Sequence, residues 1–147
     1  MDYTNIIVSL FGIVTGVFGV IFGLKKDRHV KLEAIKQYYD ESNSEELRNI
    51  RKKVAADMKR GDLNFQTISE EGKMIGFYDK WGELCAKGYL PLWLFEGAPG
   101  YHVVSQYEYF KEYIEFRRNE TYKGHKNIGY ALYFEKLAHR IMKRYKY

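Results

Sequence analysis

The feature that most constrains the fold is an uncharged, apolar run from Ile6 to Leu24. As an α-helix this run would be about 28 Å long at about 1.5 Å per residue. That length is close to the hydrocarbon thickness of a bilayer, roughly 30 Å. The sequence therefore predicts a single N-terminal transmembrane helix over residues 6–24, preceded by a short extracytoplasmic tail over residues 1–5.

The charged residues around the run give the helix an expected direction. The first five residues contain no Lys or Arg, whereas four basic residues follow the run: Lys25, Lys26, Arg28 and Lys31. A secretory signal peptide would need a positive start, and a buried core helix is seldom apolar for so long, so both alternatives rank below the membrane anchor. Positive residues stay on the cytoplasmic side. We predict a single-pass protein of the inner (cytoplasmic) membrane, with its N-terminus outside and the four basic residues at the lipid headgroups.

Small residues recur from Asn5 through the same run at alternating intervals of four and three positions. They are Asn5, Ser9, Gly12, Gly16, Gly19 and Gly23. In a helix this spacing places them on one stripe, and small residues let helix backbones approach closely in lipid. The stripe predicts packing against a second copy or another membrane protein, while ordinary glycine-rich membrane composition is the alternative.

The rest of the chain is predicted to be all-α, with a small cytoplasmic domain of about five helices over residues 45–147. A basic juxtamembrane helix and turn, residues 25–44, connects it to the anchor. Apolar positions recur at helical spacing, and Ser42 with Glu45 forms a capping-box pattern. The expected helices cover about residues 30–40, 45–60, 67–87, 90–95, 103–118 and 127–144, with a loop at 97–100.

Composition narrows the classes of function. The chain carries 24 Lys and Arg against 19 Asp and Glu, a net charge of +5, but the two signs are interleaved. Without a concentrated basic stripe, we do not expect a nucleic-acid partner. The 14 Tyr and 9 Phe are read as core residues of a small domain rather than as a base-stacking platform. Cys85 is the only cysteine, so there is no disulfide framework.

One stretch resembles a known family. It runs from Phe77 to Leu90 and is followed by Leu94-Phe95, an aromatic helix from Tyr107 to Phe116, and Arg117-Arg118. This pattern is similar to the DUF4760 family of small prokaryotic and phage-borne proteins of unknown function. The resemblance covers roughly residues 45–120 and implies an N-terminal membrane helix with a helical cytoplasmic domain. It implies no activity.

One set of residues leaves a catalytic alternative open. The four histidines, His29, His102, His125 and His139, show no metal-ligand spacing, and there is no phosphate-binding or dinucleotide motif. We therefore expect no metal, no cofactor and no enzymatic activity. However, Arg118 and Asn119 followed by His125 resemble the ribonuclease motif of HEPN domains. In that alternative His125 would move a proton at a 2′-hydroxyl while Arg118 holds the phosphate.

Together these patterns favour a membrane-anchored, oligomerising interaction protein, in a phage or phage-defence setting suggested by the family resemblance. Two alternatives remain open at this point. One is the ribonuclease described above. The other is a membrane-perturbing effector in which oligomerised anchors disrupt the bilayer.

Overall fold

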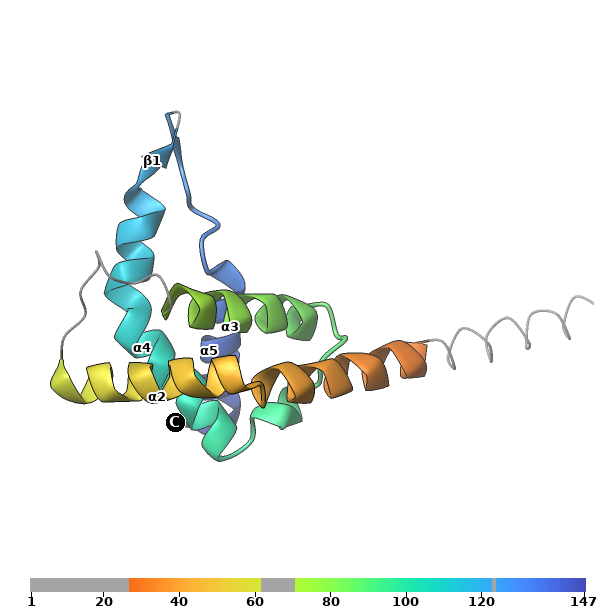
Figure 1. Ribbon diagram of the computed structural model, residues 1–147. Coiled ribbons are helices and arrows are strands. Elements are labelled where there is room, and N and C mark those ends of the chain that lie inside the picture. The colour runs from red at the N-terminus through yellow and green to blue at the C-terminus, as the bar shows by residue number, and fades with distance from the viewer. Residues whose placement is uncertain (1–26, 62–70, 123) are drawn as a thin grey trace, which may run out of the picture.

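The structure is a computed structural model that describes residues 27–61, 71–122 and 124–147. It begins with a helix over residues 27–42 and ends with helix α5 (Figure 1). Between them lie α2 (Glu45–Arg60), α3 (Glu71–Ala86), the 3₁₀ helix η1 (Leu92–Phe95), α4 (Ala98–Asn119), and the short strands β1 (Thr121–Tyr122) and β2 (His125–Lys126); α5 spans Leu132–Tyr145. The predicted all-α class is confirmed for this part of the chain, with one small hairpin added.

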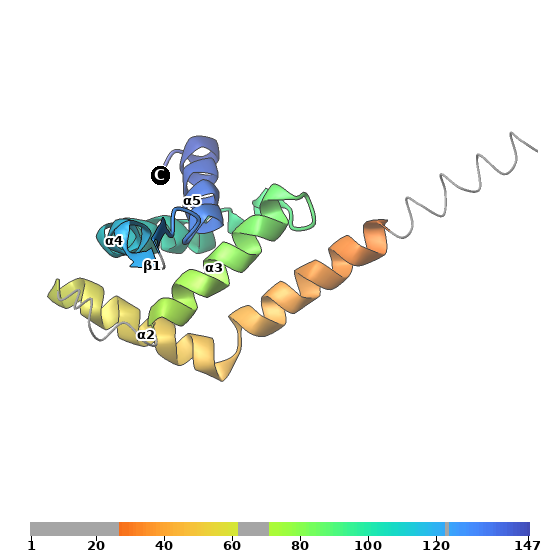
Figure 2. The ribbon, with the colours of Figure 1, turned by 90° about the horizontal axis from the view of Figure 1, so that it is seen from above.

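Helix α2 begins and ends on local signals. The Ser44 side chain accepts a hydrogen bond from the Leu47 backbone N–H at 3.3 Å, and Gly61 ends the helix at a φ of 69°. The predicted end is therefore right, but the cap is Ser44 rather than Ser42, because the preceding helix continues through residue 42. The helix over 27–42 and α2 meet at an angle at residues 43–44 (Figure 2).

The core lies where α3, α4 and α5 pack together. Trp81 from α3, Phe110 from α4 and Phe134 from α5 are completely buried. α3 and α5 approach so closely at Gly82 that an added Cβ would lie 2.3 Å from the Tyr133 carbonyl oxygen. Only glycine fits there without displacing one of the two helices.

The start of α5 is held by a side chain from α3. Ala131, at the N-cap position, has a φ of 53° and offers no capping side chain. Instead, the Asp79 carboxylate accepts the backbone N–H groups of Tyr133 at 2.8 Å and Phe134 at 3.0 Å. Asp79 therefore satisfies two N–H groups that a helix leaves unpaired at its first turn.

Three local predictions are corrected by the structure. The segment 97–100, predicted as a loop, contains the first residues of α4, because proline is compatible with the first turn of a helix. Strands β1 and β2 form an antiparallel pair, with Thr121 opposite Lys126, and this pair extends away from the helices (Figure 1). Ile128, predicted in the last helix, is 75% exposed and precedes α5.

The membrane part of the predicted fold class is also corrected. In residues 27–61, 71–122 and 124–147, no helix is long and apolar enough to cross a membrane. The longest of the helices from α2 to α5 is α4, and charged residues such as Glu108, Lys111 and Glu112 interrupt it. The single-pass membrane character and the inner-membrane localisation are thus contradicted. The run 6–24 and the tail 1–5 lie outside the described residues.

Candidate functional site

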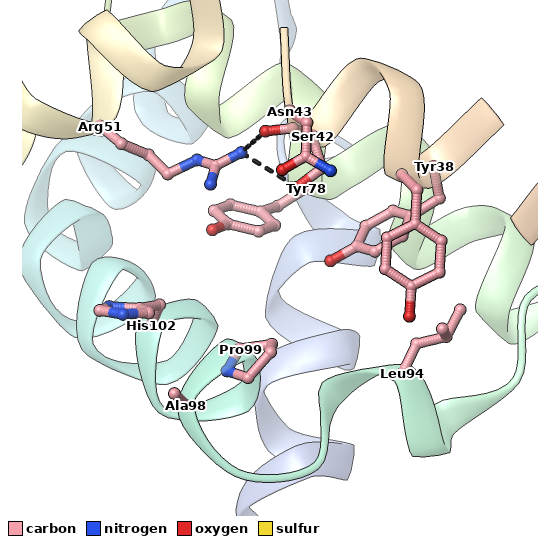
Figure 3. Close-up of a pocket in the computed structure, with 10 residues that line it drawn as sticks. Tyr38, Ser42, Asn43, Arg51, Tyr78, Leu94, Ala98, Pro99 and His102 are labelled. Carbon is pink, nitrogen blue, oxygen red and sulfur yellow. Dashed lines mark hydrogen bonds between the residues drawn. The ribbon is translucent and has the colours of Figure 1, made fainter. Parts of the chain in front are cut away.

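A cavity of about 300 Å³ lies where the helix over 27–42, α2 and α3 meet η1 and the start of α4 (Figure 3). Nine of its ten lining residues come from these five helices and Asn43 lies in the turn before α2, so the site exists only in the folded chain. They are Tyr38, Tyr39, Ser42, Asn43, Arg51, Tyr78, Leu94, Ala98, Pro99 and His102.

Arg51 provides the fixed charge of this pocket. Its Nη2 donates to the Ser42 carbonyl oxygen and, at 3.0 Å, to the Ser42 hydroxyl. Its Nε is buried and has no hydrogen-bond partner. Within the described ranges Arg51 forms no ion pair, and none of the ten lining residues is acidic. The pocket is therefore electropositive, and its guanidinium charge is not neutralised by a neighbouring carboxylate.

Two buried tyrosines form much of the wall next to Arg51. Burial raises the pKa of the Tyr38 hydroxyl to about 12, against a smaller opposing effect of Arg51. Burial also raises the pKa of Tyr78 well above its ordinary value. Both phenols therefore stay protonated at neutral pH and can donate hydrogen bonds.

The opposite wall is largely apolar. Figure 3 shows Ala98, Pro99 and His102 on the α4 side of the cavity, facing Arg51 and Tyr78, with Leu94 beside them. His102 is exposed at the rim, whereas Leu94 is 5% exposed. The cavity thus has a polar, cationic end and an apolar end, the arrangement common in pockets for small organic ligands.

The sequence did not single out this pocket. In the sequence, His102 is one of four histidines without metal-ligand spacing, and Arg51 is one of many basic residues on a helix. A sharper signal was available in the apolar face of α2, because Arg51 directly follows the buried Ile50 and precedes the buried Val54 by one turn. An arginine at the edge of a buried stripe is placed to reach inward.

The residues of the ribonuclease alternative are in separate environments. Arg118 donates from Nε to the Tyr130 carbonyl oxygen at 2.9 Å, and its Nη1 lies 2.8 Å from the Glu135 carboxylate. It thereby connects the end of α4 to the start of α5. Asn119 donates to the Glu115 carbonyl oxygen at 3.0 Å. His125 is exposed on the hairpin. The ribonuclease alternative stays a prediction, with its arginine already engaged in a structural ion pair.

The remaining predicted site residues lie in or before the first helix. The small-residue stripe and the basic residues Lys25 and Lys26 are outside the described residues. Arg28 is exposed, and Lys31 pairs with Asp27 at 2.8 Å on the surface of the helix. An exposed pair of this kind contributes little to stability.

The one cysteine is not an available nucleophile. Cys85 is 3% exposed, and burial raises the pKa of its thiol. A buried thiol with a raised pKa is seldom reactive. In the part of the chain that the structure describes, no three His, Cys, Asp or Glu side chains are grouped closely enough to hold a metal ion.

A second, more open groove of about 360 Å³ lies between the first helix and the end of α3. Its apolar residues include Val30, which is 40% exposed, and Tyr89, which is 39% exposed. Exposed apolar side chains beside a groove are typical of contact surfaces.

Comparisons with protein-family models, with curated proteins and with solved structures find no match to this chain. The resemblance to DUF4760 therefore stays a prediction.

Proposed function

We propose that this chain is a non-catalytic receptor domain that binds a small organic anion in the pocket beside Arg51. The observation that carries the proposal is a guanidinium without an acidic partner, facing a cavity that contains no carboxylate. Arg51 is half-buried, and a charge partly removed from water is stabilised when a counter-charge lies beside it. A bound anion would supply that counter-charge.

The other polar groups of the pocket fit an anion better than a cation. Tyr38 and Tyr78 can donate from protonated hydroxyls, and Asn43 adds an amide donor. Hydrogen bonds between such donors and an anion are stronger than bonds between neutral groups. The pocket offers no nucleophile paired with a base, so we infer binding rather than turnover.

The test is a titration of the protein with sodium benzoate and with inorganic phosphate at constant ionic strength, followed by ¹H–¹⁵N NMR. We expect at least one anion to shift the backbone amides of Asn43 and His102 in a saturable way. Arg51→Gln should weaken that binding at least tenfold, since a hydrogen bond to a charged group contributes about 1.5–3 kcal/mol.

Arg48→Gln is the matched control. Arg48 lies on the same helix, is exposed, and does not line the pocket, so this change removes the same charge without touching the site. Binding that weakens equally in both variants would show only general electrostatic attraction and would overturn the proposal. An absence of shifts with both anions would overturn it as well.

An interaction role is a second proposal, favoured by the apolar side chains at the open groove. Val30 and Tyr89 are 40% and 39% exposed there. In this proposal the groove contacts a second copy of the chain. Sedimentation velocity should then show a concentration-dependent dimer that Val30→Glu disperses, and a strictly monomeric protein would contradict it. The suggested phage or defence setting stays a prediction.

A further inference from the structure

We infer that the ligand of the pocket is a planar aromatic carboxylate, held with its carboxylate toward Arg51 and its ring between the aromatic walls. This inference rests on the proposed anion-binding function and names the chemical class of the anion. It follows from three properties of the site: rings fixed in place, a separation of polar and apolar ends, and a single guanidinium charge.

The ring of Tyr38 is fixed by its neighbours. It meets the rings of Trp81 and Phe95 edge-on, at 5.4 and 5.5 Å between centroids, and is stacked with Phe77 at 6.0 Å. These contacts leave the ring little freedom. A wall that is already ordered loses little conformational entropy when a ligand binds.

The ring of Tyr78 is also fixed by aromatic neighbours. It stacks on Phe134 of α5 at 5.0 Å and meets Phe77 edge-on at 5.2 Å. The exposed Tyr39 and His102 add two further rings to the lining. Aromatic faces favour a planar, aromatic ligand over a puckered or branched one, because flat rings stack and meet edge-to-face.

The two ends of the pocket set the orientation of the ligand. Arg51, Ser42 and Asn43 lie together at one end in Figure 3, while Leu94, Ala98 and Pro99 lie across the cavity. A ligand with an anionic group at one end and a hydrocarbon ring at the other matches this separation. An ion that is polar on every side, such as free phosphate, leaves the apolar end without a partner.

The charge and the size of the site favour a carboxylate. Arg51 is the only Lys or Arg among the lining residues. Its planar guanidinium matches the geometry of a planar carboxylate. The volume of about 300 Å³ is at the lower end of the range for ligand pockets, which suits one ring or two fused rings.

The experiment compares four probes by calorimetry on the full chain: benzoate, cyclohexanecarboxylate, benzamide and inorganic phosphate. Benzoate and cyclohexanecarboxylate differ in planarity, while benzoate and benzamide differ in charge. We expect benzoate to bind at least threefold more tightly than cyclohexanecarboxylate, the difference that one aromatic contact produces. We expect benzamide and phosphate to bind at least tenfold more weakly than benzoate.

A pair of surface variants tests the contribution of the rings. Tyr39 lines the pocket and is 47% exposed, whereas Tyr89 is 39% exposed and does not line it, so neither change should prevent folding. Tyr39→Leu should weaken benzoate binding about threefold and leave cyclohexanecarboxylate binding unchanged. Tyr89→Leu should change neither.

The outcomes separate this inference from the proposed function. If cyclohexanecarboxylate or phosphate binds as tightly as benzoate and Arg51→Gln still weakens binding at least tenfold, the site binds anions but the assignment of an aromatic carboxylate is wrong. If benzamide binds as tightly as benzoate, or no probe binds, both the inference and the anion-binding function are wrong.

Discussion

The strongest prediction for stability concerns Asp79, the α3 residue that caps α5. Replacing it with Ala removes the acceptor of two backbone N–H groups, at 2.8 and 3.0 Å. Loss of an N-terminal cap costs about 0.5–2 kcal/mol, and hydrogen bonds to a charged group are worth about 1.5–3 kcal/mol each. Because water can reach part of this site, we expect Asp79→Ala to lower the free energy of unfolding by about 2 kcal/mol.

Thermal unfolding followed by circular dichroism is the measurement for Asp79→Ala. For a chain of about this length, a loss of about 2 kcal/mol lowers Tm by roughly 4–8 °C. Asp79→Asn keeps one acceptor oxygen but removes the charge, so its Tm should lie between those of the wild type and Asp79→Ala.

Glu83→Ala is the matched control for the loss of a carboxylate from α3. Glu83 lies one turn after Asp79 and pairs only with Lys87, on the surface, where the two side chains are 41% and 55% exposed. Removing such a pair should cost less than about 0.5 kcal/mol. If Glu83→Ala lowers Tm as much as Asp79→Ala, the capping role assigned to Asp79 is refuted.

Three other changes test the fold more briefly. Gly82→Ala should destabilise the protein by more than about 2 kcal/mol in urea unfolding, because the added Cβ would meet the backbone of α5. Gly76→Ala on the same helix should be neutral or stabilising, because nothing lies within 4 Å of the added Cβ. Arg118→Ala should lower the free energy of unfolding by about 2 kcal/mol, because it breaks a half-buried ion pair. His125→Ala should lower it by less than about 0.5 kcal/mol. If the wild type cleaves RNA and a stably folded His125→Ala protein does not, the ribonuclease alternative is favoured instead. Burial raises the pKa of Tyr38 to about 12. The stability that the protonated Tyr38 side chain contributes is therefore full below about pH 10 and is lost as the pH rises toward 12. Tyr38→Phe should make this alkaline loss of stability less steep in urea unfolding curves measured over a series of pH values.

The helices that the sequence predicted well are those with complete local signals. α2 has a capping serine, an apolar stripe and a terminal glycine, and its end at Gly61 is as predicted. The predictions for α4 and the hairpin were poorer. A Gly-Ala-Pro-Gly segment is compatible both with a loop and with the first turn of a helix. Strands of two residues are too short to show an alternating pattern.

The pocket could not be predicted for a different reason. Tyr38, Arg51, Tyr78 and His102 are separated by more than ten residues along the chain, and each has an ordinary local context. What brings them together is the packing of the first helix and α2 against α3 and α4. Spacing along one helix carries no information about such contacts.

The same packing connects the stability of the core to the shape of the pocket. Asp79 holds the backbone of Phe134, the ring of Phe134 stacks on Tyr78 at 5.0 Å, and Tyr78 lines the cavity. A change at Asp79 therefore reaches the site through Phe134, which does not line the pocket, and then through Tyr78, which does. Asp79→Ala should weaken benzoate binding about twofold to threefold even where the protein is fully folded, because a less ordered wall loses more freedom on binding. Glu83→Ala should leave the affinity unchanged. Equal affinities in wild type and Asp79→Ala would show that the position of Tyr78 is fixed by α3 alone.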